Sequence, residues 1–447
     1  MRNNNHYRKI WVEEDVGIGA VHNIIHSLTD RSQKFFGFGY DHCAIFQEMG
    51  HATLYLPDKE LKRSRDFYEK FFSNKKNVAN LGRMINRGIN DYSKILWKAE
   101  KIRLADLSNE QLWHWFKKFE EIFNQLIVLF TVIDEYNFSN FEEKIMGELK
   151  ELADDPEKVF LVLTEYKKKI ISNENSYIFK QTLMEVADNL SDKIDFSDLK
   201  NLFHEENNDI AEKKWLIKQL KLTGWVLSGV ETLALVKYWR YKLRLTYMPA
   251  VVYLDFLMIM VFGRLGLIPL DGYYYFSEEI ERIIFQKSPK LTVQELKRRK
   301  NGYFVVYEAG KTQVFWGQEA RKKRDSLIKE KQTGGREING MLVFPGNVRG
   351  KVLLLSYTRP ENHAKKIKQM KGGEIIVTEM TRPNLLPALK KASAVITDEG
   401  GITCHAAIIC RELKIPGLVG TKTATEIFKD GDIIELDGNN ATARIIK

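Results

Sequence analysis

The sequence of 447 residues is poor in cysteine and in proline. Its three cysteines, Cys43, Cys404 and Cys410, are too few for a disulfide scaffold or a cysteine-rich zinc module, and they fit a reducing cytoplasm. Ten prolines in the whole chain leave long uninterrupted stretches, which favour helices.

Long hydrophobic runs are also missing. The N-terminal segment MRNNNHYRKI lacks the apolar core of a signal peptide. The best membrane candidate, Met248 to Phe262, is shorter than the ~20 residues that span a bilayer, and it contains Asp255. We therefore expect a buried core helix there, and a cytoplasmic protein with no membrane partner.

The excess of positive charge is small. The chain has 69 lysines and arginines against 59 acidic residues, a formal net charge of +10. The basic runs Lys297 to Lys300 and Arg321 to Arg324 lack the aromatic pattern of an RNA-binding module. They are typical of solvated helix faces, and no nucleic-acid partner is expected.

The composition changes near residue 336, and the chain is too long for one compact core. All eight tryptophans precede this point, while 11 of the 29 glycines and five of the ten prolines follow it. We predict a multidomain α+β protein with a small α/β region at 1–60, a mostly α-helical domain at 61–335 and a C-terminal α/β domain at 336–447. Gly334, Gly335 and Gly340 are candidate hinge residues before the last domain.

Several local patterns in the first two regions predict particular elements. Apolar residues at spacings of three and four follow a capping box that Ser108 forms with Gln111, which indicates an amphipathic helix. Similar spacings of apolar residues indicate helices through 61–95, 140–190, 208–245 and 248–265. The β-prone segments are His51 to Pro57, Tyr273 to Phe276, and a hairpin of Tyr303 to Glu308 with Gln313 to Trp316 around Ala309-Gly310-Lys311.

The strongest chemical signal is the string TDEGGITCHAAIICRELKIPGLVG, Thr397 to Gly420. It predicts a buried strand, a tight turn at Gly400-Gly401, an N-cap at Thr403 and a helix from Cys404 to Leu413. This arrangement places His405 in the first turn of a helix, directly after two glycines.

A histidine in that position is suited to phosphate chemistry. Unpaired backbone N–H groups and the positive end of the helix dipole favour an anion beside the imidazole. The same dipole disfavours the imidazolium, so His405 is expected to be neutral and nucleophilic near pH 7. Such a histidine can carry a group covalently in a two-step transfer.

The whole string resembles the phosphohistidine domain of the PEP-utilising enzymes, which include PEP synthase, pyruvate phosphate dikinase and rifampin phosphotransferase. The triplet Thr403-Cys404-His405 and the following Ala406-Ala407-Ile408 are most similar to the PEP synthase type. The resemblance extends over 338–447, through Pro345-Gly346, Thr381-Arg382-Pro383 and Leu436-Asp437-Gly438. It implies a swivelling β/β/α domain that carries phosphoryl groups on His405, and phosphate contacts from the residues Thr403, Gly400, Gly401, Thr381 and Arg382.

Members of that family also carry an ATP-grasp domain, and often a PEP-binding barrel. Neither pattern is evident here, and no P-loop occurs. We therefore expect a phosphotransferase component with no cofactor bound by this chain. ATP and Mg²⁺ would be held by a separate ATP-grasp partner. The sequence leaves open whether ATP or PEP is the phosphoryl donor. The stretch Tyr238 to Ile283 is loosely similar to the substrate-binding helical domain of rifampin phosphotransferases, which implies a small-molecule or protein acceptor near the helical half.

Two alternatives remain open on the sequence. The chain could be a non-catalytic regulatory protein that is switched by phosphorylation of His405. The pair His22-x-x-x-His26 places two imidazoles on one helix face, but it lacks the glutamate of H-E-x-x-H, so no metal site is predicted.

Overall fold

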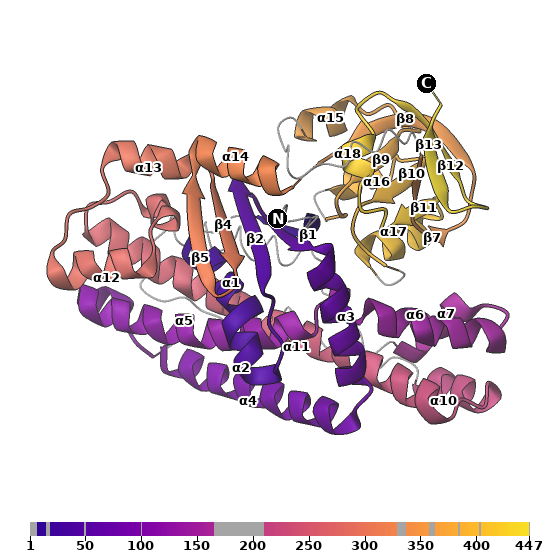
Figure 1. Ribbon diagram of the computed structural model, residues 1–447, viewed down its shortest axis with the longest axis horizontal. Helices are drawn as coiled ribbons and strands as arrows, with labels where there is room; N and C mark the ends of the chain where they lie inside the picture. The colour runs from indigo at the N-terminus through magenta and orange to yellow at the C-terminus, as the bar shows by residue number, and fades with distance from the viewer. Residues whose placement is uncertain are drawn as a thin grey trace.

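The structure is a computed structural model that describes residues 7–14, 18–48, 51–99, 101–164, 210–328, 337–356, 363–382, 385–401 and 404–446. It contains a five-stranded sheet lying on an array of helices, and a C-terminal α/β part built on an eight-stranded sheet (Figure 1). In Figure 1 the C-terminal part, in yellow, lies beside β1 and above α6 and α7.

The five-stranded sheet joins segments from the two ends of the helical region. All of its strand pairs are antiparallel, and β2 pairs with β4 from His42 to Gln47. The strand expected at His51 to Pro57 is confirmed. The expected boundary at residue 60 does not divide this sheet, because strands that precede and strands that follow that residue pair within it. In spatial order the strands are β1 (Tyr7–Glu14), β3 (His51–Pro57), β2 (His42–Glu48), β4 (Tyr303–Glu308) and β5 (Lys311–Trp316).

The predicted hairpin is confirmed, with a shorter turn. Ala309 and Gly310 have φ values of 46° and 85°, as a two-residue type I′ turn requires, so Lys311 already belongs to β5. The pairing runs from Glu308–Lys311 to Tyr303–Trp316.

The two faces of this sheet have different neighbours. Ile45, Leu54 and Val305 point into the large core that the helices form, whereas Ala44 and Phe46 point to the opposite face, where α14 (Gly317–Leu327) packs through Ala320. The sheet therefore separates the helical core from α14.

Helices account for most of the chain between the strands. The longest is α11 (Gly224–Arg264). It joins most of the predicted helix at 208–245 to the predicted helix at 248–265 without a break. Over the described residues, no helix combines the length and apolarity needed to cross a bilayer. The other helical elements described before α14 are α1 (Ile18–His26), the π-helix η1 (Ser27–Arg31), α2 (Ser32–Phe36), α3 (Asp58–Phe72), α4 (Lys75–Ala99), η2 (Leu104–Asp106), α5 (Asn109–Val132), α6 (Glu135–Leu152), α7 (Pro156–Thr164), α10 (Ile210–Gln219), η3 (Pro269–Tyr274), α12 (Ser277–Gln286) and α13 (Val293–Lys300).

The helix α5 begins with the predicted capping box. The Gln111 backbone N–H donates to Ser108 Oγ at 3.3 Å, and the Ser108 N–H donates to Gln111 Oε1 at 2.8 Å. The apolar stripe that follows is largely buried and packs on α11, where Phe119 stacks on Tyr253 with ring centroids 4.6 Å apart.

Replacing Ser108 by alanine should loosen the first turn of α5. Loss of an N-cap costs about 1 kcal/mol, so the Gln111 amide should exchange with solvent about fivefold faster. Hydrogen exchange read by NMR or mass spectrometry measures this. Ser93→Ala, on an exposed position inside α4, is the matched control and should leave exchange in α5 unchanged. Unaltered exchange at Gln111 in S108A would contradict the capping role.

The predicted strand at Tyr273 to Phe276 is wrong. Tyr273 and Tyr274 belong to a 3₁₀ helix, η3, and Tyr275 and Phe276 connect it to α12. Pro269 opens that helix, and a side chain on Gly272 would come within 2.8 Å of Met258 Sδ, so close packing against α11 fixes the turn. The next helix, α12, begins at Ser277 with two acidic residues in its first turn.

The C-terminal part has a mixed sheet in which β8, β9, β10 and β11 run parallel. Its strands, in spatial order, are β6 (Glu337–Asn339), β13 (Thr442–Ile445), β12 (Ile433–Asp437), β8 (Val348–Leu354), β9 (Ile375–Thr378), β10 (Ala394–Thr397), β11 (Gly417–Val419) and β7 (Met341–Phe344). The helices are α15 (His363–Gln369), α16 (Leu386–Leu389), α17 (His405–Leu413) and α18 (Ala424–Ile427). Helices α16 and α17 pack on one face of the sheet, and α18 and Phe428 pack on the other.

Gly340 is not a hinge. It lies between β6 and β7, and a Cβ there would come within 2.8 Å of Leu418 Cγ and 2.9 Å of the Val419 carbonyl oxygen. Close approach of these strands therefore requires glycine. Gly334 and Gly335 lie outside the described residues.

Candidate functional site

His405 lies in the first turn of α17, as the sequence predicts, but the helix begins one residue later than predicted, at His405 itself, and the cap differs. The N-cap is Cys404, whose Sγ accepts the Ala407 N–H at 3.4 Å. The prediction of Thr403 as N-cap is therefore wrong, because Cys404 has the extended backbone (φ −69°, ψ 164°) that a cap needs and a side chain that reaches the third amide. Thr403 itself lies outside the described residues.

Thr381 and His405 come together, although 24 positions separate them. Thr381 follows β9, and its Oγ1 lies 2.8 Å from His405 Nδ1. The two strands that precede these residues, β9 and β10, are parallel neighbours, so both loops leave the same edge of the sheet. The threonine is 5% exposed, which fixes its hydroxyl beside the half-buried imidazole.

This contact links the reactivity of the ring to its tautomer, because Thr381 Oγ1 can accept a hydrogen from Nδ1 or donate one to it. If Nδ1 donates its hydrogen to Thr381 Oγ1, Nε2 of the neutral ring carries a lone pair. In that tautomer Nδ1 holds the orientation of the ring, and Nε2 is the nitrogen that can act as a nucleophile.

The two predicted glycines form the turn before α17. Gly400 has φ +112°, and a Cβ there would lie 2.6 Å from Cys404 Sγ, so only glycine fits. Gly401 accepts the Cys404 N–H at 3.0 Å, and a Cβ on it would meet no described atom within 4 Å. Gly400 is exposed and Gly401 is half-buried, so the turn beside the start of α17 is partly open to solvent.

Arg382 is half-buried and follows Thr381 directly. Its contact with phosphate, like that of the two glycines, stays a prediction. The structure brings Thr381, the glycine turn and His405 to one edge of the sheet.

An ion-pair cluster next to this edge was not predicted. Lys9 Nζ, from β1, lies 2.9 Å from Asp398 Oδ2 and 3.7 Å from Glu379 Oε1. It also donates to Thr425 Oγ1 at 3.3 Å, and the Thr425 N–H donates to Asp398 Oδ1 at 3.0 Å. The side chains of Lys9, Glu379 and Asp398 are 8%, 0% and 1% exposed, so the charges are shielded from water. We call these four residues the Lys9 cluster.

The Lys9 cluster ties the five-stranded sheet to the loops of the candidate site. Glu379 lies two residues before Thr381, and Asp398 lies two residues before Gly400. A bulge at Ile10, where the register with β3 shifts between Lys9 and Trp11, interrupts the edge strand beside this lysine. Burial acts to lower the pKa of Lys9, but Asp398 and Glu379 outweigh it and raise that pKa above its usual value.

The other sequence candidates have different surroundings. His22 and His26 do lie together, with their Nε2 atoms 3.2 Å apart, yet no group of three histidine, cysteine or acidic side chains that could hold a metal occurs among the described residues. The basic run at 297–300 is only partly solvated, because Arg299 is 7% exposed and pairs with Glu279 at 2.7 Å.

The family model that matches this chain lies in the C-terminal part. Residues 370–441, which include Thr381, Gly400 and His405, match the family "PEP-utilising enzyme, mobile domain". The probable phosphoenolpyruvate synthase of Archaeoglobus fulgidus is 42% identical over 118 residues, which are 26% of this chain and 15% of that protein. The probable phosphoenolpyruvate synthase of Methanothermobacter thermautotrophicus is 45% identical over 112 residues, 25% of this chain and 16% of that one.

A longer match reaches into the helical half. The uncharacterized phosphotransferase YvkC of Bacillus subtilis is 28% identical over 183 residues, which cover 39% of this chain and 21% of that protein. The chain thus spans well under a third of the length of each of these relatives.

Proposed function

Residues 370–441 belong to the mobile-domain family of the PEP-utilising enzymes, and on this premise we propose that the chain acts in phosphoryl transfer with His405 as the carrier. The observation that carries the proposal is the 2.8 Å contact between Thr381 Oγ1 and His405 Nδ1. It supports an orientation of the ring in which Nε2 attacks phosphorus.

The proposed chemistry has two steps. Nε2 of His405 forms a bond to phosphorus while the bond from phosphorus to the donor's leaving oxygen breaks. The N–P bond then breaks as an acceptor oxygen attacks, and the electron pair returns to the imidazole. Backbone amides at the start of α17 would stabilise the charge that develops on the phosphoryl oxygens.

The partners of this transfer are also proposals. A separate ATP-grasp protein would hold ATP and Mg²⁺ and supply the phosphoryl group, and the C-terminal part would swivel between that donor and an acceptor near the helical half. The similarity to phosphoenolpyruvate synthases supports a carrier of this kind. Thr403, Gly400, Gly401, Thr381 and Arg382 would contact the phosphate.

A chemical donor tests the carrier without the partner. Potassium phosphoramidate phosphorylates histidine, so the purified chain should take up an acid-labile, base-stable phosphate on the peptide that contains His405, at Nε2. Mass spectrometry under alkaline conditions locates the label. A label spread evenly over the nine histidines would contradict a special role for His405.

Replacing Thr381 by valine should slow this labelling. Valine keeps the shape but cannot accept the Nδ1 hydrogen, so the ring loses both its orientation and its fixed tautomer. Loss of one such hydrogen bond, worth about 0.5–1.5 kcal/mol, corresponds to a rate about two- to tenfold lower. Thr381→Ser keeps the hydroxyl and should label at close to the wild-type rate. Equal rates for T381V and T381S would remove the hydroxyl from the mechanism.

A further inference from the structure

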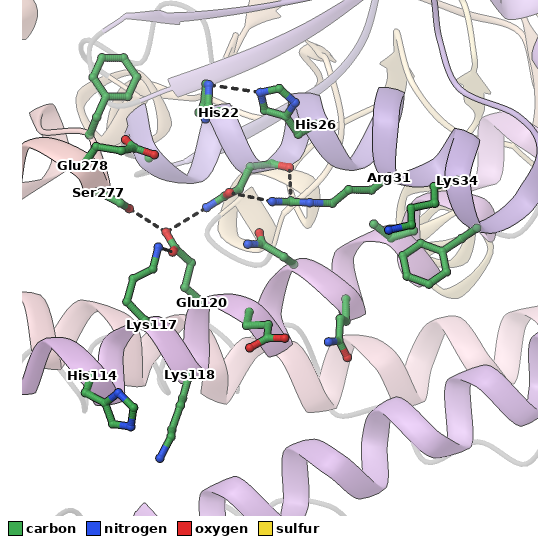
Figure 2. Close-up of a pocket in the computed structure, with 18 residues that line it drawn as sticks. His22, His26, Arg31, Lys34, His114, Lys117, Lys118, Glu120, Ser277 and Glu278 are labelled. Atoms are coloured by element: carbon green, nitrogen blue, oxygen red, sulfur yellow. Dashed lines mark hydrogen bonds and ion pairs between the residues drawn. The ribbon is translucent and has the colours of Figure 1, made fainter. Parts of the chain in front are cut away.

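A cleft of about 790 Å³ lies between α1 and α5, and Figure 2 shows the side chains that line it. Its walls come from α1, η1, α2, α5 and the start of α12. The volume is that of a small-molecule site. The site described above does not use any residue of this cleft.

One wall carries a chain of hydrogen bonds that ends on two imidazoles. Tyr307, on β4, donates from its hydroxyl to Asp30 Oδ1 at 2.7 Å, and Asp30 Oδ2 lies 2.9 Å from His26 Nδ1. His26 Nε2 lies in turn 3.2 Å from His22 Nε2. Carboxylate, first imidazole and second imidazole therefore form a continuous relay.

The relay fixes the tautomers. Desolvation and the hydrogen bond to Asp30 raise the pKa of Tyr307 to about 12, so the phenol remains a donor. Burial acts to raise the pKa of Asp30, but hydrogen bonds from Tyr307 and His26 lower it overall, which keeps a carboxylate there. Since a carboxylate only accepts, His26 holds its hydrogen on Nδ1, and its Nε2 accepts the hydrogen of His22 Nε2.

His22 is consequently left with an acceptor nitrogen, Nδ1. Burial, followed by the neighbouring His26, lowers the pKa of His22, which favours the neutral ring. A neutral imidazole that a carboxylate relay orients is the arrangement of a general base.

The rest of the lining is polar, with cations from η1, α2 and α5. Glu120, which is 8% exposed, accepts from Ser277 Oγ at 2.7 Å and from Asn23 Nδ2 at 3.3 Å, and it pairs with Lys117 (Figure 2). Its charge is thereby matched within the protein. The other lining cations are Arg31, Lys34 and Lys118, and the other lining carboxylates are Glu121 and Glu278.

We propose that this cleft binds a small anion that carries a hydroxyl group, with the hydroxyl donating to His22 and the anionic group held by Arg31, Lys34 and Lys118. The proposal rests on the proposed function, because the bound molecule would be the phosphoryl acceptor. Its oxygen forms the bond to phosphorus, the N–P bond of phosphorylated His405 breaks with its electron pair left on that ring, and the hydroxyl proton passes to His22.

Histidine-selective isotope labelling of the full chain tests the binding by NMR. We use glycerol 3-phosphate as the probe, inorganic phosphate as the anion without a carbon-bound hydroxyl, and glycerol as the neutral molecule. The first should shift the His22 and His26 resonances saturably at millimolar concentration and bind more tightly than phosphate, while glycerol leaves them unmoved. The preference for glycerol 3-phosphate over phosphate should disappear in His22→Phe.

Removing two lining cations should weaken that binding. The double variant Lys34→Gln/Lys118→Gln should raise the dissociation constant of glycerol 3-phosphate about tenfold. Lys297→Gln/Lys322→Gln removes the same charge far from the cleft and should bind as the wild type does. Absence of a saturable shift up to about 20 mM, or equal weakening in both double variants, would overturn the site.

Labelling of His405 with phosphoramidate separates the two proposals. If the K34Q/K118Q protein labels normally and the wild type shows no binding in the cleft, the cleft assignment fails alone. If the cleft binds the probe as expected and His405 takes up no phosphate, the carrier assignment fails, and with it the role of the bound molecule as acceptor, while the binding site stands.

Discussion

His405→Asn is expected to take up no acid-labile, base-stable phosphate from any donor. Asparagine has no ring nitrogen that can form the N–P bond, so labelling at this position should fall to background, at least about 100-fold below the wild type. The fold should be retained, because the side chain is half-buried and the helix is held by its buried face, Ala406, Ala407, Ile409 and Cys410. Quantitative mass spectrometry at alkaline pH measures the label.

His363→Asn is the matched control for that experiment. His363 is also the first residue of a helix in the C-terminal part, α15, but that helix does not follow the Gly400-Gly401 turn. Its replacement should leave labelling of the His405 peptide intact. A wild-type level of label in H405N would show that the carrier lies elsewhere.

Lys9→Met is expected to cost about 3–5 kcal/mol of stability, because it leaves the buried carboxylates of Asp398 and Glu379 without their cation. Chemical unfolding should show the loss, and the Thr425 amide, which donates to Asp398, should exchange faster. The double variant Lys9→Met/Asp398→Asn should lose less than the two single changes together, as expected for partners in one pair.

Lys366→Met serves as the control for the ion pair. Lys366 pairs with Asp430, but the two side chains are 28% and 44% exposed, so the change should cost under about 1 kcal/mol. If K9M cost no more than K366M, the Lys9 cluster would have no role in joining the two parts.

The dependence of this stabilisation on pH follows from the raised pKa of Lys9. A lysine whose pKa is higher in the folded state contributes fully below its unfolded value of about 10.4 and loses the contribution as the pH rises through the folded value. The difference in stability between wild type and K9M should therefore be constant from about pH 6 to pH 9 and shrink in stronger alkali. A difference that vanished near neutral pH would contradict the pairing.

Much of the fold is predictable where neighbours in sequence decide the structure. The capping box at Ser108, the hairpin after Tyr303 and the helix that begins at His405 all depend on residues within one or two turns. The family resemblance implied a phosphate contact for Thr381, but the sequence did not predict its direct contact with His405, which lies 24 positions away.

The remaining features depend on tertiary packing that leaves no local signal. Lys9 is one of 69 basic residues, and nothing near it in sequence marks it as the partner of Asp398, 389 positions away. The relay on His26 needs Tyr307, 277 positions from Asp30. The strand expected at Tyr273 failed for a similar reason, because packing of Gly272 on Met258 and Phe262 outweighed the β propensity of three tyrosines.

The five-stranded sheet has a consequence for the speed of any catalytic cycle. Tyr307, the first residue of the hydrogen-bond relay, lies on the face of the sheet that the helices cover. Lys9 is paired with Tyr55, and both lie on the opposite face. A C-terminal part docked on Lys9 is thus on the far side of the sheet from the cleft. Under the proposed function, it would have to detach before it could deliver a phosphoryl group there. Turnover would then be limited by a diffusive rearrangement, so it should slow in proportion to solvent viscosity and speed up when the docking is weakened.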